Sequence, residues 1–483
     1  MGSPSFADIP TGGWEGPSAG SGATEWVVSE RAHRVDLTQG RLTCADARSL
    51  GFAFGQDHVL TAAHKPVAAA RASDHFVAWL RDTAKVRLSK KEAQQIRRAA
   101  KKLLESLEPQ VCERELATLQ RVLTRGGRHA NEEVQRLSDD GQMLFELLQR
   151  FLGGWDPHSL IRSPDESDAL LRTLSGADAR VSTGALVEVQ VGNAQRKVAV
   201  IRVPAFYGRG VAGQLESSGE VHSSTADLRA ALRQAKQQGA SAVVLDLRHN
   251  PGGELGEAID ATGLFLGDAA IVGALDASRN LTPMQDSDPG IVYAGPVVVL
   301  VDGQSASGAE IFAGALQDYG RAIVLGETTY GKGTVQQVRA LAGGQILYTF
   351  TVAVYFLPSG RTPQLYGIQP DIWSTHPAVE GNKPFGEAAV TERDLPYPIA
   401  VADHVPSFLS PPESVNPGAS HSGSDQKAWI PIDLTAFSDL SNQLHDPARA
   451  QLTNGQAPAV AGLEPQVKEA ARLAALLAAR LNR

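Results

Sequence analysis

The sequence predicts an α/β protein, in which a mainly helical region precedes a core built on a largely parallel sheet and a helix follows near the C-terminal end. Three observations predict this fold class. Leucines recur at helical spacing through residues 89–152. Short, almost wholly apolar segments alternate with helical segments through residues 177–375, a pattern typical of parallel sheets. Residues 464–481 carry one apolar stripe at helical spacing.

Composition agrees with a folded, globular chain. Of the 483 residues, 42% are hydrophobic and 20% are charged, which excludes a fully disordered protein. The net charge of −8 disfavours a nucleic-acid-binding protein. No run of 18 apolar residues is present, so no membrane-spanning segment is expected.

Shifts in composition divide the chain into five parts. Residues 1–24 are rich in Gly, Ser and Pro and lack the basic and apolar regions of a secretory signal, so a disordered leader is expected. A helical N-terminal domain is predicted over 25–175 and the α/β core over 176–375. A loop-rich extension over 376–460 then precedes a C-terminal helix over 461–483.

The N-terminal domain is predicted to contain at least three helices. Ser89 and Glu92 have the spacing of a capping box, which predicts a helix that ends before Pro109. Leucine spacing predicts two more helices over 111–123 and 131–152. The many Lys and Arg residues between 85 and 102 are interpreted as a solvated helix face.

The core is predicted from alternating strands and helices. Strands are expected at 198–203, 242–247, 296–302 and 322–325, and helices at 225–238, 255–266 and 309–319. The only two cysteines, Cys44 and Cys112, exclude a disulfide-rich scaffold and a Cys-rich zinc site. They allow one disulfide at most, and the sequence leaves open whether it forms.

A candidate nucleophile follows one of these strands. The segment Asp302-Gly-Gln-Ser-Ala-Ser-Gly-Ala-Glu310 forms a turn of small residues between a strand and a helix. Such a turn exposes a serine hydroxyl and points backbone N–H groups and the positive end of the helix toward the same place. This arrangement suits a nucleophile whose reaction develops negative charge on oxygen.

A candidate base follows the next strand. Lys332 lies between Gly331 and Gly333 in a segment with few charges. Burial disfavours an ammonium group and lowers the pKa of a lysine. A neutral lysine can take a proton from a serine, as in Ser–Lys catalytic dyads.

Several motifs in one order resemble the carboxy-terminal processing (tail-specific) proteases, the S41 serine peptidases. These motifs are Asp302-Gly-Gln-Ser-Ala-Ser-Gly-Ala-Glu-Ile311, the segment 317–322, and Gly326-Glu-Thr-Thr-Tyr-Gly-Lys-Gly-Thr-Val-Gln-Gln337. Upstream, Leu245-Asp-Leu-Arg-His-Asn-Pro-Gly-Gly253 resembles the family's Gly-rich loop, and residues 156–164 resemble the segment before its PDZ module. Downstream, residues 366–372 match another family element. The resemblance covers about residues 140–375.

The resemblance implies a ClpP/crotonase-like protease core and assigns its site residues. The nucleophile falls on Ser307, and the general base falls on Lys332, 25 residues later. Gln336 falls on the position that orients the lysine. The oxyanion hole falls on the backbone N–H groups of Gly308 and Gly253. No cofactor or metal is implied.

One serine, one acid and one glycine need separate treatment. Ser305 lacks the family spacing to Lys332, so it is expected to play no catalytic part. Asp318 matches an acid of the tail-specific branch and is a supporting candidate. An alternative interpretation is that Asp318 ends a helix by binding backbone or Arg321. Gly308 stands where the family more often has Ala, a difference that keeps the backbone N–H.

The sequence departs from the family where a PDZ module is expected. Residues 174–176 lead almost directly to the apolar segment 185–191, which leaves no room for that module. PDZ domains capture a substrate's C-terminus by adding it as a strand to a sheet edge. The resemblance thus implies a peptidase of unfolded or C-terminally tagged polypeptides, periplasmic or otherwise exported, with a homo-oligomer or an adaptor open as a partner. The alternative is a catalytically idle scaffold.

One competing signal is set aside. Residues 51–64 resemble the catalytic-histidine segment of trypsin-like proteases and end at His64. That chemistry also needs a downstream Gly-Asp-Ser-Gly-Gly serine loop, which is missing. The histidines of the chain lack metal-binding spacing, so no metal site is expected.

Overall fold

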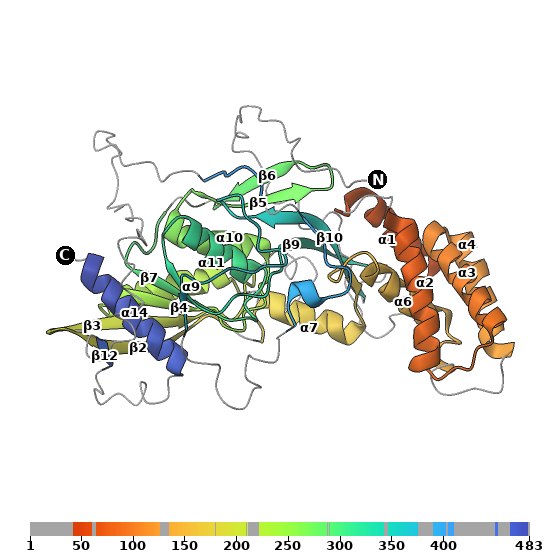
Figure 1. The fold of residues 1–483 in the computed structure, drawn as a ribbon, viewed down its shortest axis with the longest axis horizontal. Helices are drawn as coiled ribbons and strands as arrows, with labels where there is room; N and C mark the ends of the chain where they lie inside the picture. The colour runs from red at the N-terminus through yellow and green to blue at the C-terminus, as the bar shows by residue number, and fades with distance from the viewer. Residues whose placement is uncertain are drawn as a thin grey trace.

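The structure is a computed structural model, and the part of it that is described covers most of the chain. The described residues are 42–59, 64–125, 135–178, 180–208, 210, 222–286, 288, 290–341, 346–374, 390–401, 404–409, 450–452 and 464–481. The molecule is elongated, with the N-terminal helices at one end and the last helix, α14 (Pro465–Leu481), at the other (Figure 1). The predicted leader lies outside the described residues.

The helical end contains six described helices. The capping box predicted for one of them is confirmed, because the Ser89 hydroxyl accepts from the Glu92 N–H and the Glu92 carboxylate accepts from the Ser89 N–H. The helix predicted over 131–152 is described from residue 140 onward, and residues 131–134 lie outside the described part. The helices are α1 (Cys44–Asp57), α2 (Lys65–Asp82), α3 (Lys90–Ser106), α4 (Pro109–Arg125), α6 (Asp140–Gly153) and α7 (Pro164–Ser175).

A seven-stranded sheet forms the centre of the core, in the order β11-β8-β7-β4-β3-β2-β12. The four pairings from β11 to β3 are parallel, and the two pairings of β2 are antiparallel. The prediction of a largely parallel sheet is therefore confirmed. Its strands are β2 (Ser182–Val191), β3 (Ala194–Arg202), β4 (Ala242–Asp246), β7 (Val297–Val301), β8 (Ile323–Gly326), β11 (Ile372–Trp373) and β12 (Ala450–Leu452).

A second, five-stranded sheet was not predicted. All its pairings are antiparallel, and β10 lies at its centre, between β9 on one side and β1 and β5 on the other. All ten residues of β10 are buried. The strands are β1 (Leu160–Ile161), β5 (Ala270–Asp276), β6 (Leu281–Gln285), β9 (Thr334–Ala340) and β10 (Leu347–Phe356).

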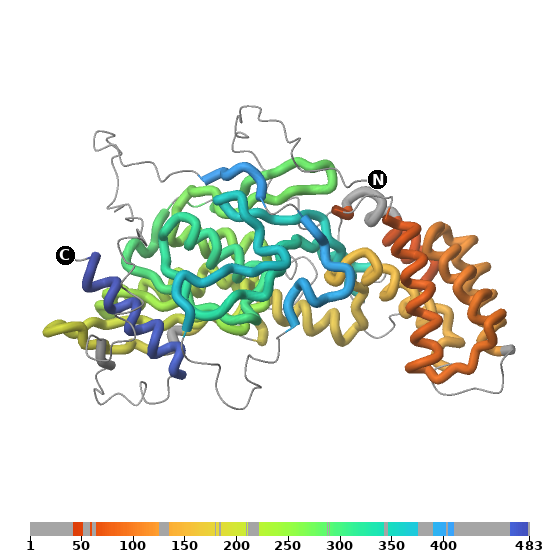
Figure 2. Tube along the Cα trace, viewed as in Figure 1, coloured from red at the N-terminus to blue at the C-terminus, as the bar shows by residue number. Residues whose placement is uncertain are grey.

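The elements stack in layers, which the ribbon and the tube show in the same view (Figures 1 and 2). Alternate residues of the parallel sheet face opposite ways: Val243 and Leu245 contact one set of helices, whereas Val244 contacts α14. The helices on the first face are α9 (Ser224–Gln237), α10 (Leu255–Leu266) and α11 (Gly308–Asp318). Of these, α10 and α11 also contact β5 of the second sheet.

The N-terminal helices share a hydrophobic core with the second sheet. Phe76 and Leu147 of the helices belong to the same buried cluster as Phe350 of β10. The helical region and the protease-like core are therefore continuous in their packing, while the predicted domain boundaries stay predictions. From Ser175 at the end of α7 the chain reaches Ser182 of β2 directly, so no further domain lies between these elements.

The loop-rich extension contacts the core at several places among the described residues: the Val405 N–H donates to the Gly360 carbonyl, for example, and β12 pairs with β2. Residues 376–389, 402–403, 410–449 and 453–460 of the predicted extension lie outside the described residues. Within the described part, a short 3₁₀ helix, η3 (Glu392–Asp394), is held to the core by Glu392, which accepts from the Gln364 side chain and contacts His158. Across the described residues, no helix has the length and apolarity that a membrane crossing requires.

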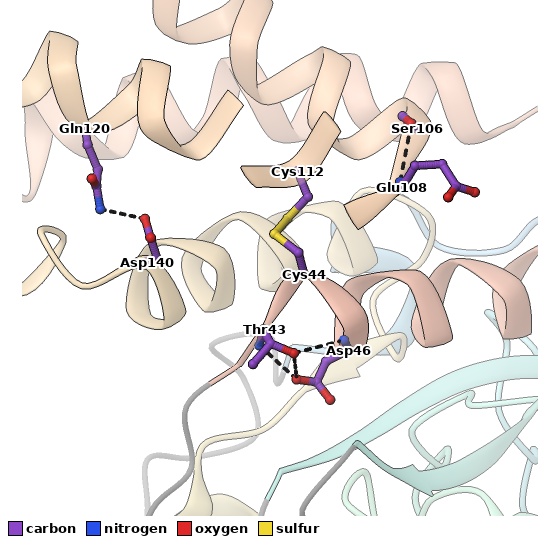
Figure 3. Close-up of a disulfide and its surroundings, with 8 residues drawn as sticks. All are labelled: Thr43, Cys44, Asp46, Ser106, Glu108, Cys112, Gln120 and Asp140. Carbon is purple, nitrogen blue, oxygen red and sulfur yellow. Dashed lines mark hydrogen bonds between the residues drawn. A yellow bond between two sulfur atoms is a disulfide. The ribbon is translucent and has the colours of Figure 1, made fainter. Parts of the chain in front are cut away.

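A disulfide joins α1 to α4 (Figure 3). Cys44 is the first residue of α1, and its sulfur bonds to that of Cys112, 68 residues away. Beside it, Thr43 and Asp46 form a capping box that begins α1. The question that the sequence left open is thus answered: the two cysteines pair.

We predict that replacing both cysteines by serine lowers the free energy of unfolding by roughly 2–4 kcal/mol, because a disulfide closing a long loop restricts the unfolded chain. Denaturant unfolding of the wild type and the double variant, each with and without reductant, measures this. Reductant should destabilise only the wild type. Equal stability of the two proteins in the absence of reductant would contradict the prediction.

Candidate active site

Ser307 lies in a strained turn at the start of a helix. It is the residue before α11, half-buried, with φ 55° and ψ −115°. A non-glycine residue rarely takes a positive φ, and such strain persists only where the surroundings impose it. Strained strand-to-helix turns present nucleophilic serines in other hydrolases. The predicted nucleophile therefore has the backbone geometry that this role requires.

The neighbouring Ser305 is part of the turn's framework. Its side chain is fully buried, and its hydroxyl donates to the Leu247 carbonyl over 2.8 Å. Asp302 accepts from the N–H groups of Gln304 and Ser305, each over 3.0 Å. These contacts fix the turn and leave the Ser305 hydroxyl away from solvent.

The Gly-rich loop lies directly against the Ser307 turn. The Ala306 N–H donates to the Asn250 carbonyl over 2.9 Å, while the Asn250 side chain accepts from the Gly252 N–H over 2.8 Å. Gly252 has φ 99°, and a Cβ at this position would lie 2.8 Å from both Gly308 N and Ser307 Cβ. Only glycine permits this approach.

Both predicted oxyanion-hole residues adjoin this contact. Gly308 is the first residue of α11, where a backbone N–H has no intrahelical carbonyl to bind. Gly253 follows Gly252, has φ 143° and is bridged to Phe206, whose oxygen a Cβ at Gly253 would approach to 1.9 Å. The loop thus brings Gly253 beside the helix start that carries Gly308.

Lys332 and Gln336 lie together, as predicted. The Lys332 ammonium donates to the Thr334 carbonyl over 3.0 Å and to the Gln336 side-chain oxygen. The Gln336 amide nitrogen in turn donates to the hydroxyls of Thr334 and Thr351. Because β9 begins at Thr334, Gln336 reaches the lysine from an extended segment.

The environment of Lys332 favours its neutral form. Burial lowers its pKa to about 8, although the nearby carboxylates of Glu392, Glu310 and Asp156 act in the opposite direction. This agrees with the prediction of a desolvated lysine. At mildly basic pH a substantial fraction of this lysine therefore carries no proton.

A buried carboxylate joins the two turns. Glu310 has no exposed surface, and it accepts from the N–H groups of Ser307 (2.8 Å), Gly331 (2.7 Å) and Lys332 (2.9 Å) and from the Thr329 hydroxyl (2.6 Å). Burial raises the pKa of Glu310 to about 7, and these four hydrogen bonds limit the rise. One side chain therefore fixes the positions of the predicted nucleophile and base.

Tyr355 adds a second link. Its hydroxyl lies 2.7 Å from the Lys332 carbonyl and 3.1 Å from the Ser307 carbonyl. Burial raises the pKa of Tyr355 well above its usual value, so the hydroxyl keeps the proton that it donates. Neither link was predicted from the sequence. Glu310 had a signal, since it stands three residues after Ser307 as in a capping box, but Tyr355 had none.

Asp318 anchors the far end of α11. Its carboxylate accepts from the Ser359 N–H and the Arg361 guanidinium, each over 2.9 Å. This is the kind of contact that the alternative interpretation expected, but the partner is Arg361. Arg321 instead donates to backbone carbonyls, those of Tyr293 and Gly295 among them. None of the partners of Asp318 belongs to the Ser307–Lys332 pair.

Two other kinds of site were considered from the sequence: a catalytic histidine at His64 and a metal site. His64 is exposed at the start of α2, and residues 60–63 before it lie outside the described part. Among the residues that the structure describes, no group of three or more His, Cys, Asp or Glu side chains is placed to hold a metal ion.

Comparison with known proteins identifies the family of this region. Residues 197–374 match the sequence model of peptidase family S41. The chain is 34% identical over 202 residues to the tail-specific protease of Haemophilus influenzae, which covers 40% of this chain and 26% of that protein. It is 37% identical over 170 residues to the chloroplastic carboxyl-terminal-processing peptidase 3 of Arabidopsis thaliana, covering 34% and 33% of the two chains.

Residues 197–374 therefore form a domain of peptidase family S41, as the resemblance implied. The chain spans less than half the length of either relative. Among solved structures, the photosystem II D1 C-terminal processing protease aligns with a TM-score of 0.32 at 28% identity, over 40% of this chain and 47% of that one.

We predict that Glu310→Gln lowers the free energy of unfolding by about 1–3 kcal/mol, because the amide NH₂ faces backbone N–H groups and leaves one of them unpaired. Thermal and denaturant unfolding measure the loss. The matched control is Glu166→Gln at the exposed capping box of Ser163, where we expect a change below about 0.5 kcal/mol. Equal effects of the two substitutions would contradict the prediction.

Proposed function

We propose that this protein is a serine endopeptidase in which Ser307 and Lys332 form the catalytic dyad. The observation that carries the proposal is the Glu310 carboxylate, which binds the backbone of both residues and so fixes one relative to the other. The lowered pKa of Lys332 supports its assignment as the base. Membership of the central domain in peptidase family S41 supports the reaction class.

In the proposed mechanism, neutral Lys332 takes the proton of the Ser307 hydroxyl as its oxygen attacks a peptide carbonyl. The N–H groups of Gly308 and Gly253 stabilise the resulting oxyanion. The protonated lysine then gives its proton to the leaving amine, which leaves an acyl-enzyme. Water, deprotonated by the same lysine, releases the acid and restores the serine. Gln336 holds the lysine amine by its side-chain oxygen throughout.

We propose unfolded or C-terminally tagged polypeptides as substrates. Two relatives carry names that refer to tail-specific and carboxyl-terminal processing, and these names motivate the assignment. The short connection from α7 to β2 implies that substrate capture does not use a domain at that place. We propose that an extended substrate instead pairs through its main chain with a sheet edge. Such binding depends little on the amino-acid sequence of the substrate.

We further propose a periplasmic or other exported location. The Cys44–Cys112 disulfide supports it, since structural disulfides persist in oxidising compartments. A homo-oligomer or an adaptor stays open as a partner.

The dyad is tested by comparing two neighbouring serines. Ser307→Ala should lower kcat/KM on an unfolded protein substrate by about 10³-fold or more, because it removes the nucleophile. Ser305→Ala removes a framework hydroxyl and should keep most of the activity at a stability loss of about 1 kcal/mol. Purified variants with matched circular dichroism spectra are compared. Undiminished cleavage by Ser307→Ala would refute the dyad, and an inactive wild type would favour the idle scaffold.

The pH dependence tests the base. Activity requires neutral Lys332, whose pKa is about 8, and ionised Glu310, whose pKa is about 7. Both groups gain a proton as the pH falls, so kcat/KM should decline steeply from pH 8 to pH 6.5 and be restored when the pH is raised. Lys332→Arg should be inactive throughout, because a guanidinium stays protonated. An active Lys332→Arg enzyme would show that another base operates.

A further inference from the structure

A second buried polar cluster lies behind Gln336, and the proposed mechanism does not use it. It consists of His58, Asp156, Ser159 and Thr351, which we call the Asp156 cluster. Each of the four residues is at most 2% exposed. Buried polar groups of this kind are retained only where hydrogen bonds offset their desolvation.

The Asp156 carboxylate is surrounded by donors. His58 Nε2 lies 3.0 Å from one of its oxygens, and the Ser159 hydroxyl donates to the same oxygen over 2.5 Å. Its other oxygen accepts from the Thr351 hydroxyl over 2.9 Å and from backbone N–H groups of residues 158 and 159. Although burial acts in the opposite direction, the hydrogen bonds from His58 and Ser159 lower the pKa of Asp156. The carboxylate is therefore ionised at neutral pH.

The direction of each hydrogen bond toward Lys332 follows from this charge. An ionised carboxylate only accepts, so the Thr351 hydroxyl must give its proton to Asp156. The oxygen of that hydroxyl is then left to accept from the Gln336 amide nitrogen, 3.1 Å away.

With its nitrogen held in this way, Gln336 turns its side-chain oxygen toward the Lys332 ammonium. A reversed amide would instead point two N–H donors at a cation that has no lone pair to accept them. The order of donors from Asp156 to Lys332 therefore selects one of the two orientations of Gln336.

The cluster is built from the helical region and the second sheet. His58 follows α1 and Asp156 follows α6 in the helical region, whereas Thr351 lies on β10. The two parts are also joined through the backbone, because the Val59 N–H donates to the Thr351 carbonyl over 2.9 Å. The helical region thus reaches the catalytic lysine through side chains.

We propose that Asp156, held by His58 and Ser159, is a positioning residue that acts through Thr351 to set the orientation of Gln336 and thereby of Lys332. This inference rests on the proposed Ser307–Lys332 dyad. It makes the helical region a structural part of the active site.

The orientation of Gln336 has a measurable effect on pH dependence. Three carboxylates act on Lys332 from different elements: Glu392 from η3, Glu310 from α11 and Asp156 after α6. Against that constant background, the Gln336 oxygen stabilises the ammonium form. If the amide reverses, its N–H groups disfavour that form, and the pH at which Lys332 loses its proton falls.

The test uses two substitutions at Thr351. Thr351→Val keeps the shape but removes the hydroxyl, whereas Thr351→Ser keeps the hydroxyl. The matched control is Thr262→Val on α10, a fully buried threonine whose hydroxyl donates only to the Ala258 carbonyl of its own helix. We measure kcat, KM and the pH profile on a peptide substrate. We also measure the rate at which a small fluorophosphonate labels Ser307, which needs no polypeptide substrate.

We expect Thr351→Val to lower kcat and the labelling rate about tenfold or more with little change in KM, the size expected when one ordering hydrogen bond is lost. The acid limb of both pH profiles should move to lower pH. Thr351→Ser should restore both values toward wild type, and Thr262→Val should leave the acid limb in place.

Two results would overturn the positioning role while leaving the dyad intact. One is Thr351→Val with the wild-type kcat and acid limb, and the other is an equal loss in Thr351→Val and Thr351→Ser, which would point to packing. Should Thr351→Val fail to fold, Ser159→Ala decides, and an unmoved acid limb in that variant overturns the proposal. Failure of the dyad itself is distinguishable, since wild type and Ser307→Ala would then be labelled and would cleave alike.

Discussion

The site depends on one buried carboxylate. Glu310 binds the backbone of Ser307, which follows a strand of the parallel sheet, and the backbone of Lys332, which precedes a strand of the antiparallel sheet. Burying an ionised carboxylate is unfavourable unless donors surround it, and here three N–H groups and one hydroxyl do so. The two turns are therefore held together by the same hydrogen bonds that make the burial of Glu310 tolerable.

The second sheet also supplies residues that position the site. Tyr355 and Thr351 both lie on β10. Tyr355 contacts the backbone of Ser307 and Lys332, and Thr351 contacts Gln336. The same strand packs against the N-terminal helices through Phe350. The central strand of the antiparallel sheet thus connects the helical region to Gln336, which binds Lys332. The parallel sheet alone positions only the serine and the Gly-rich loop.

The sequence was informative wherever a local pattern decides the structure. Continuous apolar strands such as Val297–Val301 and the stripe of α14 have such patterns, and so does Ser307 at its turn of small residues. The second sheet lacked one, because β10 is buried along its whole length yet mixes threonines with aromatic residues, and its pairing joins segments far apart in the chain. Asp156 stood in a recognised motif, but its role depends on Thr351, 195 residues later. Such contacts arise from tertiary packing.

The charge balance at Lys332 is a property of the whole assembly. A lysine buried without partners loses its proton several pH units below the ordinary value, whereas a general base works best with a pKa near the operating pH. Burial here lowers the pKa only to about 8, since Glu392, Glu310 and Asp156 restore part of the ammonium's stability. Each carboxylate comes from a different element and binds donors of its own: Glu392 accepts from Gln364 and contacts His158 over 2.6 Å. Because burial has the larger effect, the three acids raise the pKa of the lysine without returning it to 10.5. The basicity of the candidate catalytic group is therefore set jointly by the helical region, the core and the returning extension.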